Sequence, residues 1–125
     1  MIFDTDILIW VQRGNEKAAK LIEKNEDRFL SIQSYMELLQ GAKNKTQHKN
    51  VKDFISEFEF SILPLTENIG HRALIYVEEY SISSNMRAGD AIIAATAVEN
   101  NMSLASSNIK HFKVVRELEL KSFKP

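Results

Sequence analysis

Short apolar runs alternate along this chain with longer segments whose apolar residues recur at helical spacing. This alternation is typical of α/β folds, in which helices connect parallel strands and cover both faces of the sheet. We therefore predict an α/β three-layer sandwich with a mostly parallel sheet of four to five strands. The 125 residues contain no internal repeat and no linker rich in Pro and Gly, so we expect a single domain over residues 1–125.

The same patterns predict where the individual elements lie. Strands are expected over residues 1–3, 28–32, 61–65, 103–106 and 118–120. Helices are expected over 7–13, 16–24, 34–43 and 90–99, around the apolar set Val51, Phe54, Ile55 and Phe58, and from Thr66 onward with a buried face of Ile69, Ala73, Leu74 and Val77. The polar stretch 81–89 is expected to be a loop before a helix that Asp90 caps.

The composition excludes several classes of protein. A net charge of −1 argues against a protein that binds nucleic acid by electrostatics alone. No apolar run approaches the roughly 18–20 residues of a membrane span, and we expect no membrane association. No basic stretch precedes a long apolar one at the start of the chain, so no secretory signal is expected. The absence of Cys excludes disulfides and thiolate metal sites and suits a reducing cytoplasm, where we expect the protein to act.

Positive charge is concentrated in two stretches of the sequence. The first holds Lys43, Lys45, Lys49 and Lys52, and the second holds Lys110, Lys113, Arg116, Lys121 and Lys124. One interpretation is that these residues are ordinary solvated faces. The other is that they form a rim that attracts phosphate around a separate acidic centre, as a nuclease would need.

Four oxygen-bearing side chains are expected at one edge of the sheet, because ligands of open α/β sheets bind at the carboxyl ends of the strands. Asp4 follows the first strand, and Glu37 lies one turn into the helix after the second. Asp90 begins the helix that leads into the fourth strand, and Asn108 follows that strand. Mg²⁺ and Mn²⁺ prefer such hard oxygen ligands. The spacing alone suggests a metal site without specifying one.

Each of these residues also has a purely structural interpretation. Asp4 or Asp6 would serve as a helix N-cap, and so would Asp90. Ser34 and Glu37 fit an S-x-x-E capping box, while Asn108 would be an ordinary turn residue. The structural interpretation is weakest for Asp90, because residues 91–98 are almost wholly apolar and a charge beside a buried helix must be paired, hydrogen-bonded or metal-bound.

Four short motifs stand out in order along the chain. The first is M-I-F-D-T-D-I-L-I at residues 1–9, and the second is S-x-x-S-x-x-E-L at 31–38 with Gly41 just after it. The third, G-D-A-I-I-A-A-T-A at 89–97, is the most distinctive, and the fourth joins S-S-N-I-K-H-F at 106–112 to L-x-L at 118–120. Together they resemble the motifs of the PIN-domain family, most closely those of single-domain VapC-type toxins from toxin–antitoxin pairs.

The resemblance implies an endoribonuclease that depends on Mg²⁺ or Mn²⁺ and is held inactive by a small cognate antitoxin. It implies that Asp4, Glu37 and Asp90 are catalytic carboxylates that bind the metal. Asn108 stands at the fourth catalytic position, which is often Asp in the family. An amide offers one neutral oxygen there, so a second metal would be held less tightly.

Further residues are expected to support this site. Asp6 would restore to the site the negative charge that Asn108 does not supply. Ser34 would orient a ligand or a metal-bound water through its hydroxyl. The candidate contacts to RNA are Lys43, Lys45, Lys110 and His111. The alternatives for His111 are that it acts as a general base or that it is an ordinary surface histidine. By the same resemblance a homodimer is expected.

The mechanism expected from this resemblance is hydrolysis of an RNA phosphodiester by metal-activated water. Asp4 and Asp90 would hold Mg²⁺, with Glu37 binding it directly or through water. The water attacks in line, and the metal stabilises the charge that develops on the phosphate oxygens. Because clustered carboxylates repel one another, at least one should have a raised pKa without metal.

Two alternatives stay open at this point. One is a catalytically weak PIN-like domain that binds RNA or protein without cutting, for which Asn108 is the only support. The other is an RNA-processing nuclease that is not a toxin. A receiver-type phosphoacceptor domain is a poor match, because the third predicted strand ends in L-P-L-T with no aspartate.

Overall fold

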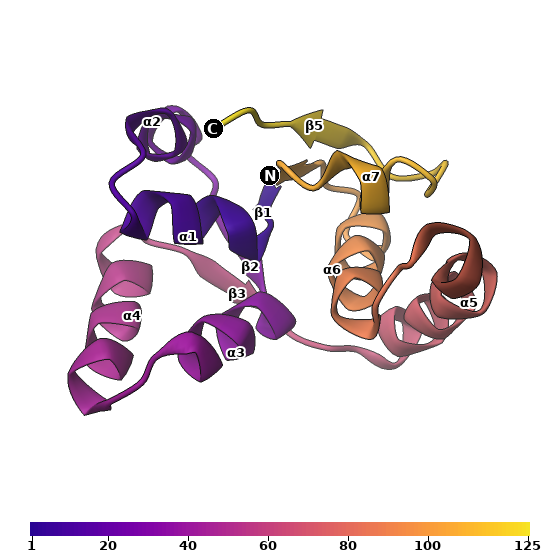
Figure 1. Cartoon of the computed structure of the whole chain (residues 1–125), viewed down its shortest axis with the longest axis horizontal. Coiled ribbons are helices and arrows are strands. Elements are labelled where there is room, and N and C mark those ends of the chain that lie inside the picture. The colour runs from indigo at the N-terminus through magenta and orange to yellow at the C-terminus, as the bar shows by residue number, and fades with distance from the viewer.

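Five short strands form one parallel sheet at the centre of the computed structural model, which describes residues 1–125 (Figure 1). The strands are β1 (Ile2–Phe3), β2 (Phe29–Ser31), β3 (Ser61–Leu63), β4 (Leu104–Ser106) and β5 (Leu120–Ser122). Their order is β3-β2-β1-β4-β5, and every neighbouring pair is parallel. The predicted α/β class and parallel sheet are therefore confirmed.

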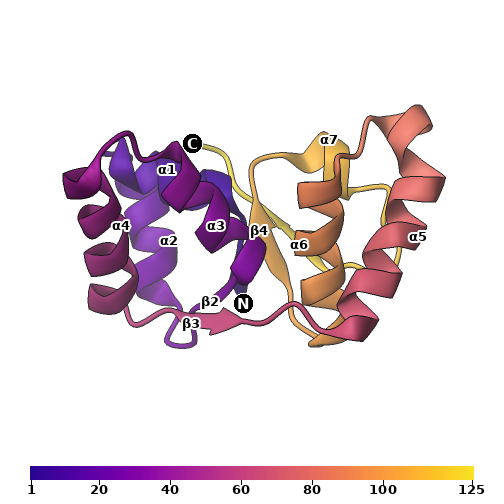
Figure 2. The ribbon, with the colours of Figure 1, turned by 90° about the horizontal axis from the view of Figure 1, so that it is seen from below.

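Seven helices connect these strands and cover the sheet. They are α1 (Thr5–Gln12), α2 (Glu16–Lys24), α3 (Ile32–Gly41), α4 (Lys45–Glu57), α5 (Glu67–Ser84), α6 (Ala88–Glu99) and α7 (Ile109–Phe112). Helices α1 to α4 lie on one side of the strands and α5 to α7 on the other, as the two views show (Figures 1 and 2). No helix combines the length and the apolar character needed to cross a membrane.

Alternate residues of the strands pack into two separate cores, because successive side chains of a strand point to opposite faces of the sheet. Ile2 and Leu104 belong to the core beneath α5 and α6. Phe3, Leu30 and Ala105 belong to the core beneath α1 to α4. All five side chains are fully buried. The central strands are thus covered on both faces, which explains their continuously apolar sequence.

Several predicted boundaries are wrong. The stretch 81–89 is not a loop, because α5 continues to Ser84, where Asn85 ends it in the left-handed conformation. Helix α6 begins at Ala88 and is preceded by Arg87, so Asp90 is not its cap. On α5, Leu74 was predicted to be buried but is 57% exposed. Tyr76 is buried on this helix instead. The last strand lies at Leu120–Ser122 instead of 118–120.

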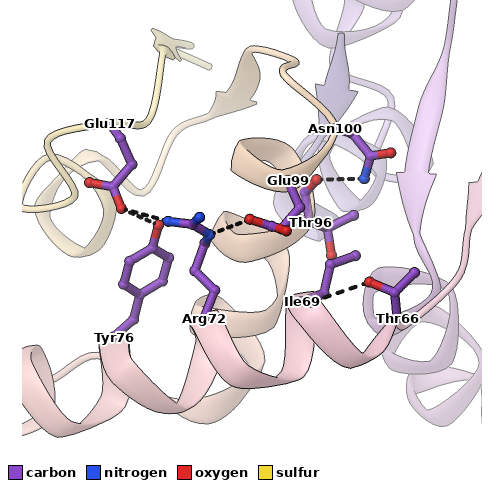
Figure 3. A network of polar contacts seen from close by, with 8 residues as sticks. All are labelled: Thr66, Ile69, Arg72, Tyr76, Thr96, Glu99, Asn100 and Glu117. Carbon is purple, nitrogen blue, oxygen red and sulfur yellow. Dashed lines mark hydrogen bonds and ion pairs between the residues drawn. The ribbon is translucent and has the colours of Figure 1, made fainter.

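Polar contacts tie α5 and α6 to the segment before β5 (Figure 3). The Arg72 side chain donates from Nε to Glu99 Oε2 at 2.6 Å and from Nη1 to Glu117 Oε1 at 3.3 Å. The Tyr76 hydroxyl donates to the same Glu117 oxygen at 2.6 Å. Two acidic side chains thus share one guanidinium. We call Arg72, Tyr76, Glu99 and Glu117 the paired cluster.

Candidate active site

Asp4 lies where β1 ends, and its carboxylate joins β1 to β4. Its backbone N–H donates to the Ala105 carbonyl at 2.9 Å, which continues the sheet pairing beyond Phe3. One carboxylate oxygen accepts from the Thr5 backbone N–H at 2.8 Å and the other from the Ser106 hydroxyl at 2.7 Å. Asp4 therefore is the N-cap of α1, and it also faces β4 at the carboxyl edge of the sheet.

The ionisation of Asp4 is strongly perturbed. Burial, followed by the negative charge of Asp6 and that of Asp90, raises the pKa of Asp4 to about 8. The hydrogen bonds from Ser106 and Thr5 act in the opposite direction and do not compensate. Asp4 and Asp6 thus interact electrostatically with Asp90 from a distant part of the chain, which matches the expectation of a raised pKa.

Asp6 holds the loop that follows β4. Its Oδ2 accepts from the Ser107 backbone N–H at 3.0 Å and from the Ser107 hydroxyl. Its Oδ1 is buried and has no hydrogen-bond partner. A buried carboxylate oxygen without a donor is energetically costly, so it marks a place where a cation or water would be stabilised.

Asp90 and Asn108 lie close together because both contact His111. The imidazole Nδ1 lies 3.1 Å from Asp90 Oδ2 and 3.0 Å from Asn108 Nδ2. Asp90 lies in the first turn of α6, while Asn108 directly precedes the short helix α7 that carries His111. Helix α7 was not predicted from the sequence, and it determines where His111 lies.

Glu37 lies in the middle of α3 and is not part of a capping box. The N-cap of α3 is Ser31, whose hydroxyl accepts from the Ser34 backbone N–H at 3.0 Å. Glu37 Oε1 instead accepts from Gln33 Nε2 at 3.4 Å. Burial and the charge of Asp90 raise the pKa of Glu37, while the Gln33 contact lowers it. Glu37 therefore belongs electrostatically with Asp90.

Gly89 shows why α6 is able to lie against α3 at this point. A Cβ on Gly89 would lie 3.2 Å from Gln33 Nε2 and 3.5 Å from Glu37 Oε1. The absence of a side chain leaves room for this close approach. The glycine of the G-D-A-I-I motif thus has a packing role beside Asp90.

Ser34 is completely buried and takes part in a row of hydroxyls. The Thr5 hydroxyl donates to Ser34 Oγ at 2.9 Å, and Ser31 Oγ lies 3.2 Å from the same atom. These contacts join the start of α1 to the start of α3. Orientation of a ligand by the Ser34 hydroxyl stays a prediction, because its observed contacts are to Thr5 and Ser31.

The predicted RNA-contacting lysines are all exposed and form no ion pair. Lys43 and Lys45 lie where α3 gives way to α4, and Lys110 lies on α7 beside His111. A groove of about 670 Å³ opens between α1, α3 and α4, with Glu37, Arg13 and Phe54 among its lining residues. Residues Ala42 and Gln47, on either side of these two lysines, also line this groove.

None of the carboxylates at this edge has a Lys or Arg partner. The only ion pair that involves them is the contact between Asp90 and His111. No three acidic or histidine side chains lie close enough together to enclose an ion by themselves, so direct ligation by Asp4, Glu37 and Asp90 stays a prediction. The donor set and the partnerless Asp6 oxygen fit a hydrated cation, since Mg²⁺ often keeps several waters and uses one or two carboxylates. We call Asp4, Asp6, Glu37 and Asp90 the unpaired cluster.

Several residues of the site were missed in the sequence analysis. Thr5, Gln33, Ser106 and Ser107 contact the predicted site residues directly. The only available signal was their position, since Thr5 lies between two aspartates, Ser106 ends a predicted strand and Ser107 follows it. Small hydroxyl residues at strand ends are too common for that position to identify them.

The sequence of this chain matches a known family and known proteins. Residues 1–118 match the family model described as "PIN domain". The chain is 30% identical over 123 residues to Ribonuclease VapC10 of Mycobacterium tuberculosis, which covers 95% of this chain and 90% of the relative. It is 28% identical to a chain of a toxin–antitoxin complex from Klebsiella pneumoniae, with 94% of this chain and 93% of that chain covered and a TM-score of 0.79.

A further solved structure shares the fold. VapBC2 from Rickettsia felis, bound to a DNA fragment from their promoter, has a TM-score of 0.80 at 24% identity and covers 99% of this chain and 100% of that chain. At this identity the likeness concerns the fold alone. It agrees with the predicted three-layer sandwich.

Proposed function

This chain belongs to the PIN domain family, and we propose that it is an endoribonuclease that depends on a divalent metal and acts as the toxin of a toxin–antitoxin pair. Nucleases of the VapC kind generally depend on a divalent metal. The observation that carries the proposal is the unpaired cluster, in which carboxylates from the end of β1, from α3 and from α6 interact at one edge of the sheet without a Lys or Arg partner. The 30% identity to a named ribonuclease supports RNA as the substrate.

Within this proposal, Asp4 and Asp90 would hold Mg²⁺ or Mn²⁺, and Glu37 would bind it directly or through water. When bound, the metal activates water and neutralises charge on the scissile phosphate. Asp4 is held in place by the hydrogen bonds from Thr5 and Ser106. Because its pKa is about 8, Asp4 must lose a proton near neutral pH before it serves as an anionic ligand.

Asn108 completes the proposed catalytic set, and Asp6 supports it. Asn108 contributes one neutral amide oxygen. Asp6 contributes negative charge next to Asp4 and fixes the Ser107 backbone, which directly precedes Asn108. We propose that Asp6 in this way offsets the missing carboxylate at position 108. Ser34 is proposed to keep α1 and α3 in register through its bond with Thr5.

RNA is proposed to approach through positive charges at the margin of the site. Lys43, Lys45 and Lys110 have no acidic partner, so they are free to contact phosphates. His111 is the fourth candidate contact. Its Nδ1 is engaged with Asp90 and Asn108, which leaves Nε2 for any contact with RNA.

The proposed partners are a small cognate antitoxin and a second copy of this chain, within the cytoplasm. Support comes from the toxin–antitoxin complex that this chain resembles at 28% identity. Size-exclusion chromatography with light scattering, alone and after co-expression with any small reading frame that adjoins the gene, tests both partners. A monomer that no co-expressed product binds would contradict them.

Cleavage of a mixed RNA substrate tests the enzymatic proposal directly. The purified protein is incubated with Mg²⁺, with EDTA, and as Asp90→Asn with Mg²⁺. We expect products only from wild type with Mg²⁺. Equal cleavage in all three reactions would refute the proposal, and RNA binding without any cleavage would favour a binding domain.

A further inference from the structure

A single hydrogen-bonded path connects the two proposed metal ligands. The Ser106 hydroxyl donates to Asp4 at 2.7 Å, and the Asn108 backbone N–H donates to the same Ser106 oxygen at 2.9 Å. The Asn108 side chain then meets His111 Nδ1, which also meets Asp90. His111 is the only side chain of this path that contacts both Asp90 and Asn108.

The chemistry of one ring nitrogen limits what His111 does at this point. In a neutral imidazole, Nδ1 either donates or accepts a hydrogen bond. As an acceptor it receives the Asn108 Nδ2 donor, and the Asn108 carbonyl oxygen is then the free end of that amide. As a donor, Nδ1–H bonds the Asp90 carboxylate. The Asn108 amide must then rotate so that its oxygen, and not its Nδ2, faces Nδ1. The orientation of Asn108 and the contact of Asp90 are therefore coupled through Nδ1.

We infer that His111 is a positioning residue that, by accepting the Asn108 Nδ2 donor at Nδ1, keeps the Asn108 amide oxygen free to face the bound cation. This inference rests on the proposed function. It assigns His111 a role distinct from an RNA contact or a general base, both of which would use Nε2. His111 is suited to this role because its side chain is only 23% exposed and is held on a short helix.

Two conservative replacements separate the ring nitrogens of His111. His111→Asn keeps a polar atom near the position of Nδ1, whereas His111→Gln places one near the position of Nε2. His111→Ala removes both. The matched control is His71→Ala, since His71 lies on α5 with a side chain that is 69% exposed and a weak contact with Glu67.

Binding of Mn²⁺ to the full chain without RNA is measured by calorimetric titration, with the free-ion electron paramagnetic resonance signal as a second readout. Loss of a group that orients a metal ligand typically weakens metal binding about 10- to 100-fold. We expect about a 10-fold weaker affinity for His111→Ala and His111→Gln, and an affinity within about threefold of wild type for His111→Asn. His71→Ala should bind as wild type.

The possible outcomes are distinguishable. If all three His111 variants bind Mn²⁺ as wild type does, or if His111→Asn is as weak as His111→Ala, the inference is overturned while the proposed function stands. If wild type binds no Mn²⁺, the proposed function fails and the inference with it. Circular dichroism melts verify folding, and should His111→Ala unfold, the comparison of the Asn and Gln variants decides.

Discussion

Two groups of acidic side chains lie at opposite ends of helix α6 and differ in what surrounds them. At its C-terminal end, Glu99 shares the Arg72 guanidinium with Glu117. At its N-terminal end, Asp90 faces other carboxylates and has only His111 as an ion-pair partner. Both groups contain acidic side chains from distant parts of the chain, so acidity alone does not distinguish them.

The ionisation of the two clusters differs accordingly. In the paired cluster, the hydrogen bond from Tyr76 lowers the pKa of Glu117, and the charge of Arg72 assists it. In the unpaired cluster, burial raises the pKa of Asp4 and of Glu37. The paired carboxylates are stabilised within the fold, whereas the carboxylates of the unpaired cluster have no Lys or Arg to neutralise them. Carboxylates with raised pKa values and no cationic partner are typical of functional sites.

The largest expected difference in RNA cleavage is between two Glu→Gln variants, one in each cluster. Glu37→Gln should lower RNA cleavage about 100-fold, because a weakened metal site loses several kcal/mol of transition-state stabilisation at about 1.4 kcal/mol per tenfold. Glu99→Gln should leave cleavage unchanged and lower the free energy of unfolding by about 1 kcal/mol. Initial cleavage rates and urea melts measure both effects. Similar rates for the two variants would remove the distinction between the clusters.

The next prediction concerns the dependence of stability on pH in EDTA. The pKa of Asp4 is raised from its ordinary value of 3.8 to about 8 in the fold, so the folded protein prefers protonated Asp4. The contribution of protonated Asp4 to the stability of the folded state is fully present below about pH 4 and is lost as the pH rises through about 8. Asp4→Asn should therefore melt at a higher temperature than wild type near pH 8, and the gap should close toward pH 4. A gap that stays constant with pH would contradict the assignment.

A third prediction tests the paired cluster itself. Arg72→Met should lower the free energy of unfolding by about 1–2 kcal/mol, between the values for exposed and buried ion pairs, because it leaves Glu99 and Glu117 without their cation. The matched control is Lys49→Met, which removes the exposed pair with Asp53 and should cost less than about 0.5 kcal/mol. Equal losses for the two variants, measured by urea denaturation, would show that the paired cluster contributes no more than a surface contact.

The smallest expected effect separates stability from activity at Gly89. Gly89→Ala should raise the free energy of unfolding by up to about 1 kcal/mol, as alanine does in helices, while its methyl group displaces the Gln33 side chain from Glu37. Cleavage should fall about threefold, or about 0.7 kcal/mol. Gly70→Ala on α5 is the control, because a Cβ there meets nothing within 4 Å. It should gain similar stability at unchanged activity, and a loss of activity in both would contradict the prediction.

Much of the fold was predictable because its signals are local. The predicted helix over 16–24 agrees with α2, and the strand predicted over 61–65 contains β3. The start of α6 was predicted two residues late, since Arg87 makes no side-chain cap and leaves no recognisable signal. Helix α3 was predicted to start at Ser34, but its N-cap is Ser31. The end of β2 determines this start, because the chain turns into the helix directly after Ser31.

The contacts of the candidate site were much less predictable. Ser106 and Asp4 are 102 positions apart, and His111 and Asp90 are 21 apart. Strand order places the first pair side by side, and the unpredicted helix α7 places the second. Nothing in the local sequence indicates that Asp6 binds Ser107 or that Thr5 bonds Ser34. Contacts of this kind depend on which segments the sheet brings together.

The sequence by itself determined the α/β class, the approximate order of the elements, and the positions of Asp4 at a strand end and of Asp90 near a helix start. These follow from apolar periodicity and from motif spacing, which act over a few residues. Only the tertiary structure decided which acidic residues acquire a cation, so that Glu99 and Glu117 meet Arg72 while Asp4 and Asp90 meet no Lys or Arg. The physical reason is that charge pairing and desolvation depend on distances between segments far apart in the chain, which local patterning does not specify.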